Sequence, residues 1–182
     1  MPRYIALLRG VNLGGHTVKM VRLKELFEEL GFKNVETFIA SGNVIFQSAS
    51  KNAAALEKKI SNHLEKSLGF PAQTFLRTDE ELAAVLEHKA CAVMGVRALY
   101  IGFLVDELSK ESTARLLAHS TKSDEFHVKG REVYWLCRTG MADSPFLRIG
   151  VEKAAGVRAT IRSVTTVAKL VDKYPAKKKR EK

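Results

Sequence analysis

Arg9-Gly-Val-Asn-Leu-Gly-Gly15 is the stretch around which the rest of the sequence is organised. It follows a short apolar run at residues 4–8 and precedes an amphipathic segment that begins near Met20. An uninterrupted apolar run is typical of a covered central β-strand, whereas apolar residues three and four positions apart are typical of a helix face. The stretch is therefore predicted to connect a first strand to a first helix.

Outward from this loop, the apolar pattern of the first 78 residues predicts alternating strands and helices. Helices are expected at residues 20–30 and 56–68, and further strands at residues 35–40, 44–47 and 72–77. The triplet Ser41-Gly-Asn43 is typical of a tight turn and makes residues 35–47 a hairpin. The order strand, helix, strand, strand, helix, strand is that of a ferredoxin-like unit.

The same order is predicted a second time. Thr78 and Glu81 have the spacing of a helix capping box, which indicates a linker helix. Beyond it we expect strands at residues 99–105, 125–129, 132–138 and 158–162, with helices at 108–119 and 146–155 and a last helix ending at Tyr174. The halves show no evident residue identity, so the repeat rests on element order alone.

The predicted fold class is α+β, with two tandem ferredoxin-like halves that each carry an antiparallel sheet, followed by a C-terminal helix and a basic tail. We expect a first subdomain at residues 1–78, a linker helix at 79–97, a second subdomain at 98–174, and a disordered basic tail at 175–182.

Composition narrows the class of protein. The net charge is +10, of which residues 1–78 carry +5 and residues 175–182 carry +4. Such a distribution is compatible with nucleic-acid binding, but more often it belongs to a surface that only keeps the protein soluble. No apolar run approaches the length of a membrane span, and no signal-peptide pattern is present. The two cysteines, Cys91 and Cys137, lack metal-binding spacing, which favours buried thiols in the cytoplasm.

Topology indicates where a binding site would lie. In the predicted sheet the first two strands are parallel, so the loop after the first, the hairpin tip and residues 69–71 meet at one edge. Free N–H groups at a helix start and accessible glycine backbone suit an anion. The candidate ligand-binding residues at this edge are Arg9, Gly10, Asn12, Gly14, Gly15, Lys19, Ser41, Gly42 and Asn43.

Other interpretations of this edge remain open. The glycines match neither the Walker A motif nor the Gly-x-Gly-x-x-Gly fingerprint, so the loop could be only a tight crossover, with Arg9 paired to a carboxylate such as Glu36. The five histidines share no metal-ligand spacing, so no metal site is predicted. His16 and Ser41 have no partner pattern for catalysis; catalytic residues and cofactors therefore stay unassigned.

At the family level, the sequence resembles the bacterial family catalogued as domain of unknown function 1697. The resemblance rests on residues 6–15, 19–23, 30–43, 76–78, 103–104 and 159–170, of which the opening motif is specific and the others are individually weak. It implies the paired ferredoxin-like architecture but no activity. The closing motif of the family resembles Thr-x-Arg-Asn-Trp-x-Thr, and here Ser163 and Val164 replace its Asn and Trp. Arg162 and Thr166 match that motif and join the candidate ligand-binding residues.

Three functions follow as hypotheses. The first is a cytoplasmic protein that binds a small anionic or phosphate-bearing ligand at the edge defined above. The second is a nucleic-acid-binding protein that uses the basic first half and tail. The third is an enzyme of unknown reaction at the same edge, so whether the chain is an enzyme is left open. No membrane partner is expected, and the oligomeric state is not predicted.

Overall fold

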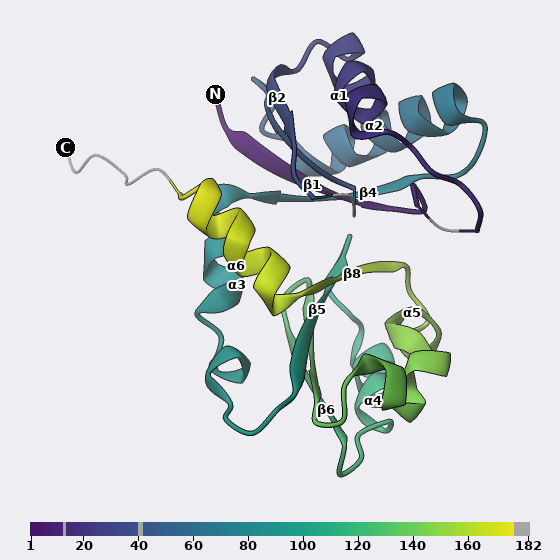
Figure 1. Cartoon of the computed structure of the whole chain (residues 1–182), viewed down its shortest axis with the longest axis vertical. Coiled ribbons are helices and arrows are strands. Elements are labelled where there is room, and N and C mark those ends of the chain that lie inside the picture. The colour runs from purple at the N-terminus through teal and green to yellow at the C-terminus, as the bar shows by residue number, and fades with distance from the viewer. Residues whose placement is uncertain (13, 40–41, 177–182) are drawn as a thin grey trace, which may run out of the picture. The chain divides into compact units, whose positions relative to one another are not determined.

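The computed structural model of the 182-residue chain describes residues 1–12, 14–39 and 42–176 (Figure 1). Within these residues lie two four-stranded antiparallel sheets and six α-helices. The chain divides into two compact units, one formed by Met1–Leu82 and the chain from Tyr174, the other by Ala83–Lys173. The predicted tail lies almost wholly outside the described residues.

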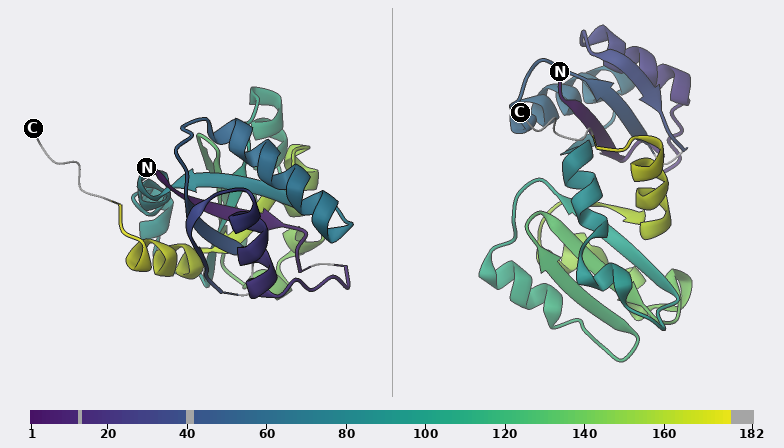
Figure 2. Two further views of the ribbon diagram at one scale, coloured as in Figure 1. Left: turned by 90° about the horizontal axis from the view of Figure 1, so that it is seen from above. Right: turned by 90° about the vertical axis from the view of Figure 1, so that its left-hand side faces the viewer.

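The first unit contains the sheet predicted around the glycine loop. Its elements are β1 (Arg3–Arg9), α1 (Met20–Glu29), β2 (Lys33–Thr37), β3 (Asn43–Gln47), α2 (Ala53–Leu68) and β4 (Gln73–Thr78). The strand order is β2-β3-β1-β4, so the third strand lies between the first two, as predicted. Helices α1 and α2 pack together over one face of this sheet (Figures 1 and 2).

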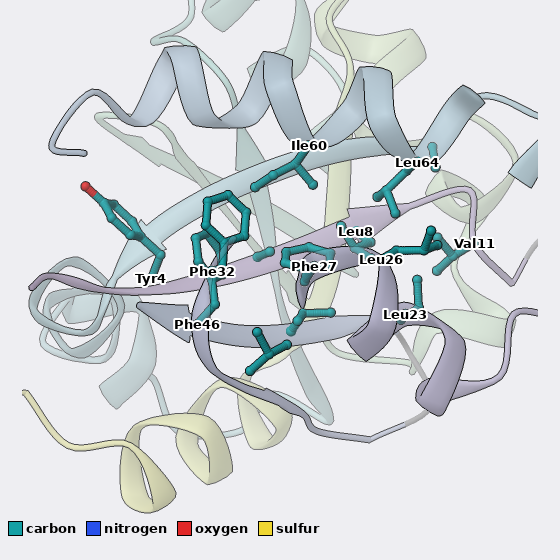
Figure 3. Close-up of a cluster of buried hydrophobic side chains, with 14 of the residues drawn as sticks. Tyr4, Leu8, Val11, Leu23, Leu26, Phe27, Phe32, Phe46, Ile60 and Leu64 are labelled. Carbon is teal, nitrogen blue, oxygen red and sulfur yellow. The ribbon is translucent and has the colours of Figure 1, made fainter. Parts of the chain in front are cut away.

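The core of the first unit lies between its helices and its sheet. Leu26 and Phe27 of α1 and Ile60 of α2 are fully buried in it, together with Phe46 of β3. Figure 3 shows Tyr4 at one end of this cluster and Val11 at the other. The three- and four-residue apolar spacing of both helices thus places their apolar faces on the sheet, which is the main source of stabilisation for such helices.

The fourth strand of the first unit leads directly into α3 (Asp79–Leu86). Its start is the predicted capping box, because Thr78 Oγ1 accepts a 3.1 Å hydrogen bond from Glu81 N and Thr78 N donates a 2.8 Å bond to Glu81 Oε2. The division between the two units falls inside this helix, after Leu82.

The second unit repeats the element order of the first. Its elements are β5 (Ala98–Leu104), α4 (Lys110–Leu117), β6 (Asp124–Lys129), β7 (Glu132–Cys137), α5 (Gly150–Ala155), β8 (Ala159–Ser163) and α6 (Val164–Lys173). The strand order β6-β7-β5-β8 matches that of the first sheet. Helices α4 and α5 pack against each other on one side of the sheet (Figure 1).

The helix predicted at residues 146–155 is interrupted in the structure. A 3₁₀ turn, Pro145–Arg148, precedes a short α5 that begins only at Gly150. Gly150 has φ of +71°, a left-handed conformation that a continuous right-handed helix does not contain. The prediction missed this break because an apolar repeat does not report backbone handedness.

Strand register reveals residue identity between the two halves, which sequence inspection did not find. The following pairs occupy matching positions in the two sheets: Tyr4 and Tyr100, Ile5 and Ile101, Leu8 and Leu104, and Arg77 and Arg162. The repeat therefore rests on matching residues as well as on element order. The segments between the matching residues differ in length in the two halves, so the identities are not evident when the sequence is inspected without the structure.

Candidate functional site

Three loops of the first unit meet at one edge of its sheet, as topology predicted. The backbone N–H of Leu8 donates a 2.8 Å hydrogen bond to the carbonyl of Gly42 in the hairpin. The loop after β1 also contacts the loop before β4, because Gly10 lies against Pro71. We call the surface formed by residues 9–12, 14–19, 42–43 and 69–71 the loop edge.

Two of the candidate glycines are required for packing within the loop edge. A Cβ on Gly10 would lie 2.8 Å from the carbonyl oxygen of Pro71, and one on Gly42 would lie 2.6 Å from Cγ2 of Val11. Both residues also have positive φ angles, +93° and +76°. Close approach and backbone conformation therefore account for these glycines without a ligand.

The other two candidate glycines have no packing role of this kind. Gly14 and Gly15 are exposed, and no described atom lies within 4 Å of a Cβ built on either. Their φ angles, +65° and +86°, favour glycine, and the absence of side chains leaves their backbone open to solvent. They are the part of the loop edge where a ligand can approach the main chain.

The two candidate asparagines hold the loops in shape. Asn12 Oδ1 accepts a 3.2 Å hydrogen bond from the backbone N–H of Val18. Asn43 is fully buried, and its Nδ2 donates a 2.9 Å bond to the carbonyl of Phe38. The expectation that Asn43 hydrogen-bonds to a ligand conflicts with this burial, because a side chain with no exposed surface cannot contact a bound molecule.

Positive and aromatic groups lie at the start of α1. Lys19 is the exposed N-cap residue, and its side chain makes no capping hydrogen bond within the described chain. No acidic residue occupies the first turn of α1. His16 is exposed and stacks on Phe70, with ring centroids 4.0 Å apart and an interplanar angle of 16°. His16 was not among the predicted ligand-binding residues. Its position in the sequence next to Gly14 and Gly15 could have identified it as a candidate.

Arg9 ends β1 at the loop edge and pairs in register with Gln73 of β4. It is partly exposed and interacts with other residues of the chain. Glu36, the carboxylate considered as its partner, accepts a 2.8 Å hydrogen bond from the hydroxyl of Tyr174. Arg9 is therefore a partly exposed cation of the loop edge that already interacts with other residues of the chain.

The remaining candidates lie elsewhere or outside the described chain. Ser41 falls outside the described residues. Arg162 and Thr166 belong to the second unit, where Arg162 Nη1 donates 2.9 Å bonds to Thr160 Oγ1 and to the carbonyl of Ile161. Burial lowers the pKa of Arg162 to about 10.

Thr166 belongs to the cap of α6. Its N–H donates a 3.2 Å bond to Ser163 Oγ, and the two hydroxyls lie 3.0 Å apart. Ser163 thus has the position of Thr78 in the first unit. Because Asn and Ser are both preferred N-cap residues, the exchange of Asn for Ser in the closing motif retains this role.

Sequence reasoning missed a hollow at the opposite end of the first unit. This pocket of about 540 Å³ is lined by residues that include Phe32, Lys33, Ser48, Ser50 and Lys59. Lys59 Nζ donates a 3.2 Å bond to the carbonyl at the end of α1 and lies 5.5 Å from the ring centroid of Phe32. No sequence signal was available, because the lining comes from four separated segments, at Met1 and at residues 30–33, 48–50 and 55–59.

Within the described residues, no group of three or more His, Cys, Asp or Glu side chains is placed to hold a metal ion. Cys137 is buried and Cys91 partly buried, and both are free thiols. None of the described helices is both long enough and apolar enough to cross a membrane.

Two compact α+β units, each with a four-stranded antiparallel sheet and a shared strand order, define the class of the protein. The sequence profile of the family described as "Protein of unknown function (DUF1697)" matches residues 1–134, and the chain belongs to this family. The resemblance at residues 159–170 lies outside that match.

The fold is similar to a solved structure, described as that of the conserved bacterial protein SP0830 from Streptococcus pneumoniae. The TM-score is 0.73 at 23% sequence identity, over 97% of this chain and 99% of that one. No curated protein matches the chain.

Proposed function

We propose that the chain is a cytoplasmic ligand-binding protein built from two ferredoxin-like units, and that the loop edge of the first unit binds a small anion such as a phosphate group. The observation that carries the proposal is the junction of an open glycine backbone, at Gly14 and Gly15, with the start of α1 at Lys19. The free thiols Cys91 and Cys137 support a reducing compartment.

Electrostatics at the start of α1 support an anion. The N-terminus of a helix carries a partial positive charge, so a cation there is unfavourable and an acidic residue is favourable. This helix has Lys19 at its N-cap and no acidic residue in its first turn. A bound anion would be stabilised by the helix N–H groups and by Lys19 together.

The charge of the loop edge has the same sign throughout. Residues 9–12, 14–19, 42–43 and 69–71 contain no Asp or Glu, whereas Arg9 and Lys19 are cations and His16 adds a third basic group. The His16 ring, stacked on Phe70, offers a flat surface beside the glycines. The absence of a carboxylate also leaves His16 without an acid–base partner from these residues, which favours binding over catalysis.

The proposal is tested by thermal unfolding with inorganic pyrophosphate as the probe, against sodium chloride of equal ionic strength. A saturating ligand at about a hundred times its Kd adds roughly 2.7 kcal/mol, which raises Tm by about 5–10 °C for a chain of this size. We expect this shift for the unmodified protein and at most half of it for Lys19→Ala.

Lys33→Ala is the matched control, because Lys33 is an exposed lysine of the same unit that lines the hollow at its opposite end. It should keep the full shift. Loss of the shift in Lys33→Ala alone would show that the anion binds in that hollow and not at the loop edge. The absence of any shift with pyrophosphate would contradict the proposal. Stronger stabilisation by an oligonucleotide that disappears with added salt would favour nucleic acid instead.

A further inference from the structure

The second unit contains a pocket of its own, lined by residues that do not belong to the loop edge. Its volume is about 390 Å³, which lies within the range of small-molecule sites. The pocket is lined by Tyr100, Trp135, Met141, Leu147, Gly150, Ile161 and Ser163. None of these lining residues is charged, although 27% of the sequence is Asp, Glu, Lys or Arg.

The corresponding place in the first unit is filled by the protein itself. Tyr4 and Phe46 occupy the register positions of Tyr100 and Trp135. Tyr4 is only 3% exposed, and its hydroxyl donates a 3.1 Å bond to the carbonyl of Ser50. Phe32 stacks on Phe46 with ring centroids 4.3 Å apart. The first unit therefore places an aromatic ring on this part of its sheet.

The second unit lacks these features. Tyr100 is only partly buried, and its hydroxyl has no hydrogen-bond partner among the residues that the structure describes. The nearest described rings, Tyr100 and Phe146, have centroids 5.1 Å from that of Trp135 and are tilted or edge-on to it. Phe126 stacks on Trp135 with ring centroids 6.4 Å apart, a longer separation than the 4.3 Å between Phe32 and Phe46.

Helix length accounts for the difference. Helix α2 has 16 residues, and Leu56 and Ile60 from its first half are buried in the core of the first unit. Helix α5 has only six residues and follows the break at Gly150. The shorter helix leaves a pocket open beside Tyr100, while Trp135 itself is only 2% exposed.

Hydrogen bonds hold one lining residue of the pocket, Trp135, in place. Trp135 Nε1 donates a 2.7 Å bond to Asp124 Oδ1, and Ser144 Oγ donates a 2.7 Å bond to the same oxygen. The indole nitrogen is therefore occupied, so the small part of Trp135 that reaches the pocket offers no free polar atom. A preformed wall of this kind lowers the entropic cost of binding.

We infer that this pocket binds a small, uncharged molecule with a flat aromatic ring. The ring would lie in the uncharged space lined by Tyr100, Leu147 and Ile161, where the partly exposed Tyr100 offers an aromatic surface. The hydroxyl of Tyr100 is the polar group available to orient it. A charged ligand is disfavoured because the lining offers no opposite charge to offset its lost hydration.

The test uses the emission of Trp135, the only tryptophan of the sequence, during titration of the full-length protein with benzamide and with benzoate. The two probes have similar shape and differ in charge. We expect benzamide to quench the emission saturably. We expect the Kd of benzoate to be at least about tenfold higher than that of benzamide, a difference of about 1.4 kcal/mol in binding free energy. Equal responses to the two probes, or quenching that never saturates, would overturn the inference.

Leu147→Glu and Leu117→Glu form a matched pair of variants. Both leucines are in the second unit and are similarly exposed, at 47% and 41%, but only Leu147 lines the pocket. Leu147→Glu should weaken benzamide binding about tenfold, while Leu117→Glu should leave it unchanged. Circular dichroism establishes that both fold. An equal effect of the two variants would show that benzamide does not bind in the pocket.

Discussion

Two buried threonines, Thr74 in β4 and Thr160 in β8, differ in the hydrogen bonding of their hydroxyl groups. Thr74 is 1% exposed, and its Oγ1 has no hydrogen-bond partner in the described part of the chain. Thr160 is 5% exposed, and its Oγ1 accepts a 2.9 Å bond from Arg162. A buried hydroxyl without a hydrogen bond destabilises the folded state. A buried hydroxyl that accepts a hydrogen bond also provides the donor with its partner.

We therefore expect the same substitution to have opposite effects at these positions. Thr74→Val should raise the free energy of unfolding by about 1 kcal/mol, because a methyl group replaces an unpaired hydroxyl. Thr160→Val should lower it by about 1–2 kcal/mol, because it removes an acceptor from the buried Arg162 guanidinium. Urea denaturation of both variants checks this, and a change of the same sign in both would refute the argument.

At the scale of elements, the outer edges of β4 and β8 are closed by helix side chains. Glu57 Oε1 of α2 accepts a 2.7 Å bond from Leu76 N, and Ser61 Oγ accepts a 3.0 Å bond from Thr74 N. In the second unit Glu152 Oε1 accepts a 2.8 Å bond from Ala159 N. Unpaired strand edges invite pairing with other chains, so these acceptors protect both sheets from edge-to-edge association.

Glu57→Ala is expected to lower the free energy of unfolding by about 2–3 kcal/mol, because it leaves a buried N–H of β4 without its acceptor. Glu57→Gln retains an acceptor and should cost about 1 kcal/mol. Glu65→Ala, on the exposed face of the same helix, is the control and should change little. Chemical denaturation measures all three, and equal losses for Glu57→Ala and Glu65→Ala would contradict the proposed role.

At the scale of the whole molecule, stability depends on pH through a buried carboxylate and the net charge. Burial acts to raise the pKa of Asp124, but hydrogen bonds from Ser144, Trp135 and Ser123 outweigh it and hold the pKa below its ordinary value. The chain already has a net charge of +10 at neutral pH. Protonation of carboxylates therefore removes specific bonds and increases self-repulsion.

Because the folded pKa of Asp124 is lower than the unfolded one, its contribution to stability is present above about pH 4 and is lost as pH falls through the folded value. Asp124→Asn should therefore lower the free energy of unfolding at pH 7 and flatten its decline below pH 4. Denaturant titrations from pH 7 to pH 2 measure this decline. An unchanged slope in the variant would show that Asp124 does not contribute to acid lability.

Local signals sufficed for most of the fold. Apolar periodicity and the helix signals at Gly69 and Thr78 correctly indicated each strand that the structure describes and the main helices, because these signals arise from neighbouring residues. They also led to the strand order of the first sheet, and thus to the meeting of three loops at one edge. The broken helix at Gly150 was not predicted, since a left-handed backbone leaves no trace in an apolar repeat.

The sequence by itself determined the element order, the family and the place where the glycine loop lies. Only the tertiary structure decided what each residue there does: Gly10 and Gly42 are fixed by contacts with other loops, Asn43 is buried, and Gly14 and Gly15 remain accessible. The pocket beside Trp135 also depends on tertiary structure. The physical reason is that burial and close approach depend on residues far apart in the chain, whereas periodicity and turn preference depend on neighbours.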